Sequence, residues 1–444
     1  MIIFLETLGC SRNQVDSEIM LGKLVAHGHS ITDDPSLAEV IIVNTCGFIS
    51  TASDEAVDVI LEMAEFKKKG KCEKLIVTGC LSQRYKDDKS LVSTLPEVDA
   101  FLGTGACDHI VEVVEEKQVK TLTLFSDPNI REFQNILEPR QLTSEVFAYI
   151  KVSEGCNRKC TYCIIPQLRG LQRSRPKEDI CKEAESMISR GVKEIILTAE
   201  NTTDYGQDLH DGTGFEHVLT SLAKTLDNNH NPAWIRFLYT HPKTLTREVV
   251  LSVKNHKNIC SYYDVPIQHA SSSILKKMGR SYTNSDLYTL FKTIRQTDPQ
   301  AVLRTTIIVG FPGETKEDFN ILMQFIKDIK FDHLGVFTYS DSLDLKSHHL
   351  KNHIHKDLAE ERHDIIMATQ ARISQEVNNG YVGKTFEVLV EENPEPGLYI
   401  ARTMFQAPEV DGVTFIYENE LEIGTFVNVR VTDGFEYDIA GVIA

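Results

Sequence analysis

Strand-like and helix-like segments alternate along most of the 444 residues, and this alternation most constrains the fold. In the N-terminal part, short apolar runs at 2–8, 40–43 and 75–77 are separated by helix-period stretches at 15–26 and 52–66. Strands that alternate with helices in this way form parallel sheets. We therefore expect residues 1–125 to form an α/β domain built as a parallel βαβαβ sheet.

A cysteine lies two or three residues after each of these three apolar runs. They are Cys10, Cys46 and Cys80, and consecutive ones are about one strand-helix unit apart. In open parallel sheets, the ligand crevice lies at the carboxyl ends of the strands. The three thiols are therefore expected to converge on one edge of the sheet. The alternative is that they are buried structural cysteines at strand ends.

Residues 147–375 carry six further strand candidates, and helical patterns such as 177–189 and 316–330 follow most of them. The candidates lie at 148–152, 193–198, 234–239, 261–267, 302–309 and 333–339. Repeated βα units favour a βα barrel, but six are fewer than the eight of a closed one. We expect a partial (βα)6 barrel with an open side, joined to the first domain by a polar, proline-containing linker at 126–146.

The last segment, 380–444, has a different pattern. Four short strands are expected at 385–390, 398–403, 412–417 and 426–431, with glycine and proline turns and no helical period. This pattern is typical of a small all-β barrel.

Composition limits the class of protein. The charge balance is 47 Lys+Arg against 64 Asp+Glu, a net of −17, which argues against non-specific nucleic-acid binding. No apolar run approaches the ~18 residues of a membrane helix, and Glu6 interrupts the N-terminal apolar run too early for a signal peptide. A cytoplasmic protein without membrane association is expected. Its ten cysteines should then be metal ligands, catalytic thiols or apolar fillers rather than disulfides.

Three more cysteines follow the first strand of the central domain, in the CxxxCxxC motif Cys156, Cys160 and Cys163. This spacing can bring three thiolates to one side of a tight loop. Three thiolates suit one [4Fe–4S] cluster whose fourth iron stays open for a cofactor. The alternatives are a zinc knuckle that lacks its fourth ligand, or chance.

The CxxxCxxC motif at this position resembles the radical SAM superfamily. The resemblance implies that the open iron binds the amino and carboxylate groups of S-adenosylmethionine (AdoMet). An electron from the cluster then cleaves the sulfonium to a 5′-deoxyadenosyl radical. The cofactor carries the difficult chemistry, and the protein supplies orientation.

The whole chain, with its three-cysteine domain and C-terminal barrel, resembles the radical SAM methylthiotransferases. The segments that carry this resemblance are Thr7-Leu-Gly-Cys10, Asn44-Thr-Cys46-Gly and Thr78-Gly-Cys80. It implies that Cys10, Cys46 and Cys80 hold a second [4Fe–4S] cluster, which presents sulfur. Two AdoMet molecules and an unidentified electron donor are implied as well.

The methylthiotransferases have two main branches, and the C-terminal barrel should discriminate between them. One (MiaB-like) modifies an adenosine in tRNA, and the other (RimO) modifies the β-carbon of an aspartate in small-subunit ribosomal protein twelve. Residues 381–444 resemble a TRAM domain and contain three basic and twelve acidic residues, a net of −9. Such a domain should repel a phosphate backbone and complement a basic ribosomal protein.

The stretch Phe405–Gly412 also resembles the RimO branch. Ribosomal protein twelve, alone or in the small ribosomal subunit, is therefore the expected partner, and tRNA is disfavoured. A tRNA methylthiotransferase remains the alternative within the same chemistry, and a non-catalytic iron–sulfur factor of the ribosome is the alternative outside it. The acidic surface could also serve solubility alone.

Several further residues match positions that bind AdoMet in the superfamily. Tyr162, inside the cluster loop, is expected near the adenine, or else packs on the barrel mouth. Glu200 and Asn201 end the second barrel strand, where an acid accepts from the AdoMet amino group. The RimO branch more commonly has Ala-Gln-Asp there, and this chain has Ala-Glu-Asn. Gly310, in Ile-Val-Gly-Phe-Pro-Gly-Glu-Thr, would let the backbone approach the cofactor.

Three arginines follow the cluster loop in a pattern that resembles the family's RGxxRSRP: Arg169, Arg173 and Arg175. We expect contact with the AdoMet carboxylate or with an acidic target, or else surface salt bridges. The chain departs from the family at Asp341–Ser347, a loop at the barrel mouth that bears on substrate fit. Four histidines crowd the next segment and fit a solvated helix start better than a metal site: His348, His349, His353 and His355.

Overall fold

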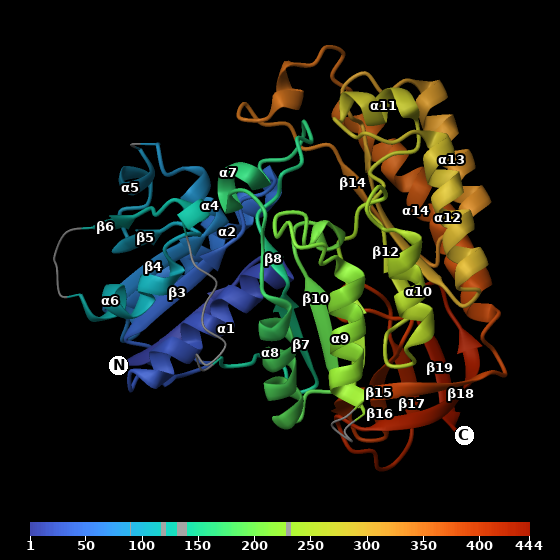
Figure 1. Ribbon diagram of the computed structural model, residues 1–444. Coiled ribbons are helices and arrows are strands. Elements are labelled where there is room, and N and C mark those ends of the chain that lie inside the picture. Colours follow the sequence, from blue (N-terminus) through green and yellow to red (C-terminus); the bar gives the residue numbers. More distant parts are fainter. Residues whose placement is uncertain (89, 117–120, 131–139, 228–231) are drawn as a thin grey trace.

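The computed structural model describes residues 1–444 except 89, 117–120, 131–139 and 228–231 (Figure 1). Most of the expected linker, at 131–139, therefore lies outside the described residues. The N-terminal sheet, the central arc of strands and the C-terminal barrel follow one another in space as in sequence. The predicted fold class, with a parallel N-terminal sheet, a partial (βα)6 barrel and a small all-β barrel, is confirmed.

The N-terminal domain is a six-stranded parallel sheet in the order β2-β1-β3-β4-β5-β6. Its strands are β1 (Ile2–Thr7), β2 (Ser30–Ile31), β3 (Val40–Thr45), β4 (Lys74–Gly79), β5 (Ala100–Leu102) and β6 (Leu122–Leu124). Its α-helices are α1 (Ser11–Ala26), α2 (Ser50–Ala64), α3 (Phe66–Lys69), α4 (Cys80–Arg84), α5 (Leu91–Thr94) and α6 (Ile110–Glu115). Strand β3 is buried along its whole length, and residues 40–43 of it form the continuous apolar run typical of a buried parallel strand.

The central domain places its six predicted strands in one arc, β7-β10-β11-β12-β13-β14. Two three-stranded parallel sheets form the arc, and a single bridge between Ile235 and Ile259 links them. The strands are β7 (Phe147–Lys151), β10 (Glu194–Thr198), β11 (Trp234–Phe237), β12 (Tyr262–Asp264), β13 (Val302–Val309) and β14 (His333–Thr338). A short antiparallel pair, β8 (Ser153–Glu154) and β9 (Arg173–Ser174), brackets the cysteine loop.

Helices line the outer side of this arc, as a βα barrel requires (Figure 1). They are α8 (Lys177–Ser189), α9 (Phe215–Asp227), α10 (Arg247–Asn255), α12 (Asn284–Thr297), α13 (Lys316–Ile329) and α14 (Lys356–Asn379). The short α11 (Ser272–Lys277) lies at the top of the arc in Figure 1, and α7 (Ile165–Arg169) follows the cysteine loop. The 24-residue α14 leads into the last domain.

The inner side of the arc is filled by the other two domains. Val15 of α1 belongs to the same buried apolar cluster as Ile196, Trp234 and Tyr262 of the arc and Leu389 of the C-terminal barrel. A partial barrel leaves its inner strand faces open, and here α1 and the barrel cover them. The three domains therefore share a core.

The C-terminal domain is a closed barrel in the order β15-β16-β17-β19-β18. Its strands are β15 (Thr385–Glu395), β16 (Leu398–Thr403), β17 (Thr414–Tyr417), β18 (Phe426–Gly434) and β19 (Ile439–Ile443). The sequence predicted four of these five strands and missed β19, because that short segment carries Gly441. A Cβ on Gly441 would lie 2.4 Å from a Val429 methyl carbon, so barrel closure requires the glycine.

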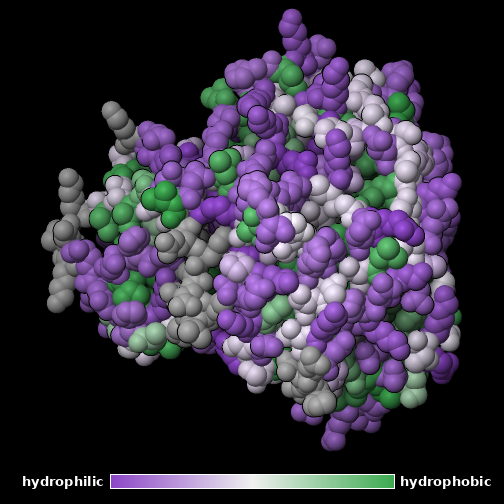
Figure 2. Space-filling view, viewed as in Figure 1, coloured by the Kyte–Doolittle hydropathy of each residue, from purple (hydrophilic) through white to green (hydrophobic). Residues whose placement is uncertain are grey.

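Among the described residues, no helix combines the length and apolar character that a membrane span needs. Hydrophilic residues dominate the face shown in Figure 2, and hydrophobic residues form separate patches on it.

Candidate functional site

The three N-terminal cysteines meet at the carboxyl edge of the first sheet, as the strand pattern predicted. Cys10 precedes α1, Cys46 follows β3, and Cys80 is the first residue of α4. The backbone at Gly9 lies close to Cys46: Gly9 has φ +98°, and a Cβ there would lie 2.8 Å from the Cys46 Cβ. The backbone on either side of the thiols can therefore come together only because residue 9 is glycine.

Burial and neighbouring charges act in opposite directions on these thiols. Burial raises the pKa of Cys80 to about 12, and the nearby Cys10 and Cys46 thiolates add to the rise, which Arg169 opposes. Burial also acts on Cys10, but Arg12 and Arg169 together bring the pKa of its thiol below the usual value. The structure therefore places two arginines where they favour thiolate at this edge.

The second triad lies in the loop between β8 and α7, at the mouth of the central arc. Burial raises the pKa of Cys163 to about 12, and the Cys160 and Cys156 thiolates raise it further, which shows that the three are neighbours. The loop is held by backbone hydrogen bonds from Cys156 N to the Gly170 carbonyl (3.1 Å) and from Thr161 N to the Met278 carbonyl (3.0 Å).

All six thiols are free cysteines. In the described part of the chain, no three His, Cys, Asp or Glu side chains gather closely enough to hold a single metal ion. A four-iron cluster makes a different demand, since each thiolate binds a different iron and the three sulfurs surround the cluster. The donor set of three thiols in each loop fits that group, and the ligand roles of the six cysteines stay a prediction.

Arg12 and Glu200 lie between the two triads. The Arg12 guanidinium is 3.4 Å from a Glu200 carboxylate oxygen and donates a 3.0 Å hydrogen bond to the Ala199 carbonyl. Glu200 also raises the pKa of Cys156, after the larger effect of burial, so its carboxylate faces the second triad as well. The carboxyl ends of β1 and β10 therefore face each other, with this ion pair between them.

Glu200 and Asn201 carry the buried polar atoms that a cofactor would satisfy. Among the described residues, neither Glu200 carboxylate oxygen has a hydrogen-bond partner, although the side chain is only 2% exposed. The buried Asn201 amide nitrogen lacks one there as well. Burial and the Glu154 carboxylate raise the pKa of Glu200. Acceptors that lack a hydrogen bond, beside a donor that lacks one, fit the ammonium and carboxylate of an amino-acid group.

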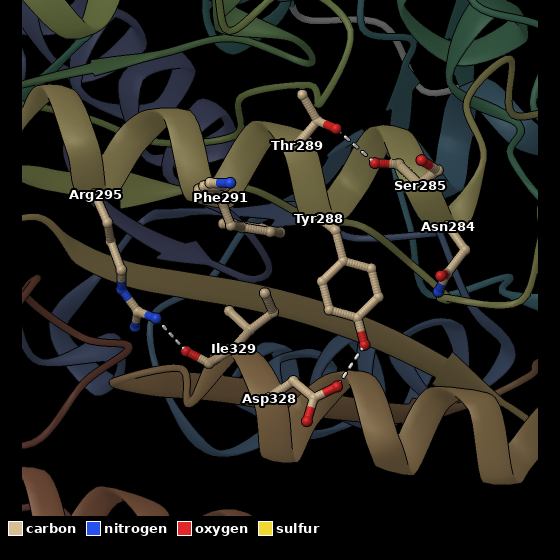
Figure 3. A pocket seen from close by; sticks show the side chains of 9 residues that line it. Asn284, Ser285, Tyr288, Thr289, Phe291, Arg295, Asp328 and Ile329 are labelled. Carbon is tan, nitrogen blue, oxygen red and sulfur yellow. Dashed lines mark hydrogen bonds between the residues drawn. The ribbon is translucent and has the colours of Figure 1, made fainter.

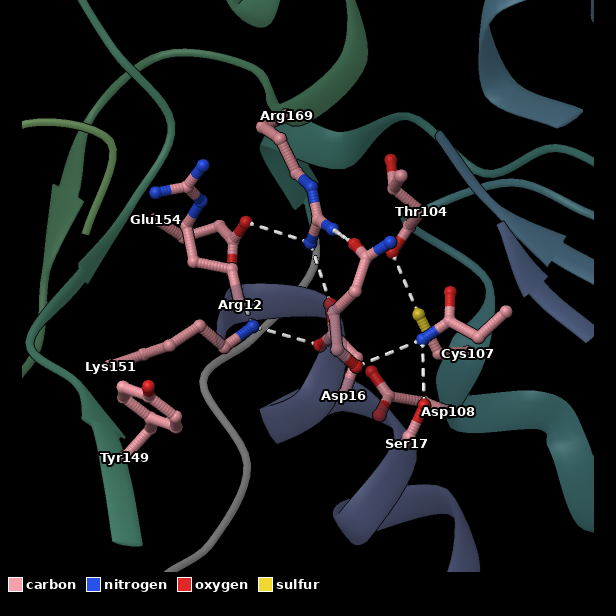
Figure 4. A network of polar contacts seen from close by, with 12 residues as sticks. Arg12, Asp16, Ser17, Thr104, Cys107, Asp108, Tyr149, Lys151, Glu154 and Arg169 are labelled. Carbon is pink, nitrogen blue, oxygen red and sulfur yellow. Dashed lines mark hydrogen bonds and ion pairs between the residues drawn. The ribbon is translucent and has the colours of Figure 1, made fainter. Parts of the chain in front are cut away.

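Arg169 is the centre of a buried polar network between the domains (Figure 4). Its guanidinium donates to Asp16 (2.6 Å), Glu154 (3.1 Å) and Asn13 (2.5 Å), and it lies 3.7 Å from the Cys80 sulfur. Lys151 completes the network with hydrogen bonds to Asp16 (2.8 Å) and Glu154 (2.6 Å). Since Arg169 is 3% exposed, these are buried ion pairs and not the surface salt bridges of the alternative interpretation.

The other two arginines of this stretch also bind protein groups. Arg175 is buried and donates to the Glu183 carboxylate (2.6 Å) and the Lys151 carbonyl (2.8 Å). Arg173 donates to the Asn129 carbonyl at 3.3 Å. The structure gives these arginines a role in joining segments, and contact with a cofactor or target stays a prediction.

Tyr162 and Gly310 lie near one another at the arc mouth. The Tyr162 ring packs edge-to-face on Phe311, 6.4 Å between centroids, and its hydroxyl accepts hydrogen bonds from Arg280 at 2.5 and 3.1 Å. Gly310 has φ +73°, and a Cβ there would lie 2.5 Å from the Ala359 Cβ of α14. Helix packing therefore already requires glycine at 310, whatever its distance from a cofactor.

The sequence analysis missed Arg12, Asp16 and Arg280. Arg12 had a local signal, since it comes two residues after Cys10 in the first turn of a helix. Asp16 follows one helical turn later on the same side. Arg280 carried no motif, because only the fold brings α11 over the cysteine loop.

A groove of about 490 Å³ lies between α12 and α13, and none of the six cysteines of the two triads lines it (Figure 3). Tyr288 donates to Asp328 (2.7 Å) across it, and Arg295 donates to the Ile329 carbonyl (2.5 Å). None of the predicted site residues lines this groove.

Comparison with known proteins agrees with the three-domain architecture. Residues 2–103 match the uncharacterized protein family UPF0004, residues 150–326 the radical SAM superfamily, and residues 382–443 the TRAM domain. The ribosomal protein uS12 methylthiotransferase RimO of Clostridioides difficile is 45% identical over 99% of this chain and 98% of its own. RimO of Desulfosudis oleivorans is 46% identical over 99% of both chains.

The chain belongs to the RimO methylthiotransferase family. The sequence resemblance is thereby confirmed, and the family's three domains are those described above. Solved structures support the fold of this RimO family member. The radical S-adenosylmethionine methyltransferase TsrM of Kitasatospora setae, with cobalamin and a [4Fe-4S] cluster bound, has a TM-score of 0.56 at 12% identity and covers 76% of this chain and 72% of its own. OxsB, a cobalamin-dependent S-adenosylmethionine radical enzyme, has a TM-score of 0.53 and covers 81% of this chain and 55% of its own.

Proposed function

We propose that this chain is a radical AdoMet methylthiotransferase that adds a methylthio group to the β-carbon of an aspartate in ribosomal protein uS12. One observation carries the proposal. Two cysteine triads occupy facing carboxyl ends of two parallel sheets in a chain 45–46% identical to RimO enzymes over its length. A protein that acts on uS12 works in the cytoplasm, and the proposal places the chain there.

Two sets of residues would bind cofactors at this site: the cysteines would bind the clusters, and polar side chains beside them would bind AdoMet. Cys156, Cys160 and Cys163 would hold the AdoMet-binding [4Fe–4S] cluster, and the N-terminal triad the other. The bound groups would supply the electron and sulfonium for radical formation, and the sulfur and methyl group to be transferred. Glu200 and Asn201 would bind the AdoMet ammonium and carboxylate through their buried atoms that lack a hydrogen bond.

The N-terminus of α1 packs against the central domain beside the two triads. Ser11 shares a 3.0 Å hydrogen bond with Thr198, and Arg12 lies over the Tyr239 ring at 4.8 Å. These contacts seat the residues after Cys10 directly on the ends of β10 and β11. Ser11 and Thr198 are both buried at this contact, and charge interactions beside buried groups are stronger than in water.

The C-terminal barrel supports uS12 as the partner. Eight of its acidic residues and two of its basic ones are exposed, so the accessible surface is acidic. Asp411 and Glu391 are partly buried and bind Tyr262 and Arg402 within the protein. An exposed surface with this charge attracts a basic protein and repels an RNA backbone.

Iron analysis tests the cluster assignment. After anaerobic reconstitution, the triple alanine variant of Cys156, Cys160 and Cys163 should bind about half the iron of wild type and release no 5′-deoxyadenosine. Cys181→Ala is the matched control, because Cys181 packs against the core of the central domain away from both triads. Unchanged iron in the triple variant would contradict the assignment.

Mass spectrometry of uS12 from cells with and without this gene tests the substrate. We expect a methylthio increment on one aspartate that disappears on deletion. Identical uS12 masses together with loss of a tRNA methylthio modification would overturn the proposal in favour of tRNA. Failure of the reduced protein to release 5′-deoxyadenosine at all would point to a non-catalytic iron–sulfur factor.

Charge reversal tests the barrel surface. Changing Glu392, Glu420 and Glu422 to Lys should weaken uS12 binding by about tenfold at low salt and less at high salt. The same reversal at three exposed acids of α14 is the control: Glu360, Glu361 and Asp364. Equal losses in both sets would mean that only overall charge matters and that the barrel is not the contact.

A further inference from the structure

The loop from β14 to α14 lies across both cysteine triads. It contains Asp341–Ser347, the segment where the sequence departs from the family pattern. In Figure 1 this loop is the orange segment at the top of the molecule, which extends from β14 toward the N-terminal domain. We call residues Ser340–Ser347 the clasp.

The clasp binds the N-terminal domain through a two-point ion pair. Arg84 of α4 donates to both Asp344 carboxylate oxygens at 2.8 Å and to the Ser342 hydroxyl at 2.9 Å. The same guanidinium donates to the Gly47 carbonyl at 2.8 Å, directly after Cys46. The Arg84 side chain is 3% exposed and the Asp344 side chain 36%, so the pair is buried on the arginine side and faces solvent on the aspartate side. Its two parallel hydrogen bonds fix orientation as well as distance.

The clasp binds the second cysteine loop through its backbone and one apolar side chain. Ser347 N donates to the Thr161 carbonyl, between Cys160 and Cys163, at 3.0 Å. Leu345 is buried in a small cluster with Cys80, Ile164 and Leu168. Leu345 thus packs against the first triad and against the residue that follows the second.

The clasp is braced internally. The Tyr339 hydroxyl is shared between Asp341 (2.9 Å) and Ser347 (2.8 Å), and His348 contacts the other Asp341 oxygen at 2.8 Å. Leu343 lies at the opposite side of the loop and is 80% exposed. The two faces of the loop therefore differ, one inserted between the triads and one in solvent.

We propose that the clasp fixes the spacing and register of the two triads, with Asp344 and Leu345 as its positioning residues. The proposal rests on the proposed function in one respect, since fixed spacing matters only if the triads act on one substrate. The segment that departs from the family pattern is then the one that holds the two cysteine loops together. If the clasp is loosened, AdoMet should still be cleaved at the second triad, but the methylthio group should be transferred to the target less often.

The test compares Leu345→Ala and Asp344→Asn with Leu343→Ala, the same truncation on the exposed side of the loop. Each reconstituted protein is assayed for bound iron and for 5′-deoxyadenosine released per methylthio group added to uS12. Without clusters, it is assayed for the rate of tryptic cleavage at the exposed Lys346. We expect unchanged iron, a ratio raised about fivefold or more, and cleavage about tenfold faster in the first two variants only.

Two outcomes would overturn the proposal. The first is a ratio and cleavage rate in Leu345→Ala and Asp344→Asn equal to those of Leu343→Ala. The second is a fall in iron in proportion to product, which would show that the loop only supports folding of the site. If wild type forms 5′-deoxyadenosine but no methylthio product, the proposed function fails, and the cleavage rates still decide whether the clasp closes.

Discussion

Arg169→Met should open the interface between the N-terminal and central domains. The substitution removes the cation shared by Asp16 and Glu154, both of which are buried. Breaking a buried ion pair from one side costs ~3–5 kcal/mol, because the remaining charge stays buried. Lys151 still contacts both carboxylates, so we expect the lower end, about 3 kcal/mol.

Hydrogen exchange of the α1 amides measures this opening directly. A loss of about 3 kcal/mol corresponds to roughly 100-fold faster exchange wherever opening limits it. Arg169→Lys keeps the charge but loses the planar fork, and its effect should be intermediate. The control is Arg372→Met, on the exposed face of α14, which should stay within about 0.5 kcal/mol of wild type.

A double variant separates charge from packing. Arg169→Met combined with Asp16→Asn restores equal numbers of buried positive and negative charges in the network. The combined loss should therefore be smaller than the sum of the single losses by ~1–3 kcal/mol. If α1 exchange in Arg169→Met stays within about threefold of wild type, the network does not hold the domains together, and the reasoning is refuted.

Burial raises the pKa of Asp318, but hydrogen bonds from three hydroxyl groups bring it down to about 2, below the ordinary 3.8. The ionised carboxylate therefore stabilises the fold above about pH 4, and this contribution is lost as the pH falls toward 2. In Asp318→Asn, the free energy of unfolding should depend less on pH between about 4 and 2, as measured by circular dichroism. Gly310→Ala should lower the melting temperature by a loss of at least about 2 kcal/mol, because φ is positive and Ala359 occupies the space. Arg402 donates to the buried Glu194 of β10 at 2.5 Å, so Arg402→Met should weaken barrel docking by about 3 kcal/mol, measured by guanidinium unfolding. The only tryptophan, Trp234, packs against Phe426 of the barrel with the ring centroids 4.9 Å apart and the planes tilted by 51°. Its fluorescence emission should shift to the red when this variant's barrel is released, at a lower guanidinium concentration than in wild type.

Local sequence signals were enough to predict the strands of the central domain and the grouping of the N-terminal cysteines. The six central strands confirm the predicted alternation, because buried parallel strands are apolar runs that polar turns interrupt. The N-terminal thiols converge because parallel strands end at one sheet edge, which needs no knowledge of other domains. Strand β19 was not predicted, because its apolar run is short and is interrupted by Gly441.

The side-chain contacts between domains could not be predicted from local sequence signals. Ser11 meets Thr198 across 187 residues of sequence, and Arg169 meets Asp16 across 153. An arginine in a polar stretch has the same local pattern whether it is exposed or buried, and only domain docking decides which. The end of the expected linker shows the same effect, since Arg140 is buried and donates to Glu18 at 2.7 Å.

The ionic groups between the triads explain why the domains dock in one register. Three cations and three carboxylates lie there: Arg12, Lys151, Arg169, Asp16, Glu154 and Glu200. The set is neutral, yet Arg12 and Arg169 also face the thiols of Cys10 and Cys80. A buried ion pair adds little net stability over apolar packing, but a misaligned one is costly. Arg12 meets Glu200 across the interface, and Arg169 meets both Asp16 and the Cys80 sulfur across it. A shift of one domain along the other would break these contacts, so the charges favour the observed docking more specifically than apolar contacts at Val15 do.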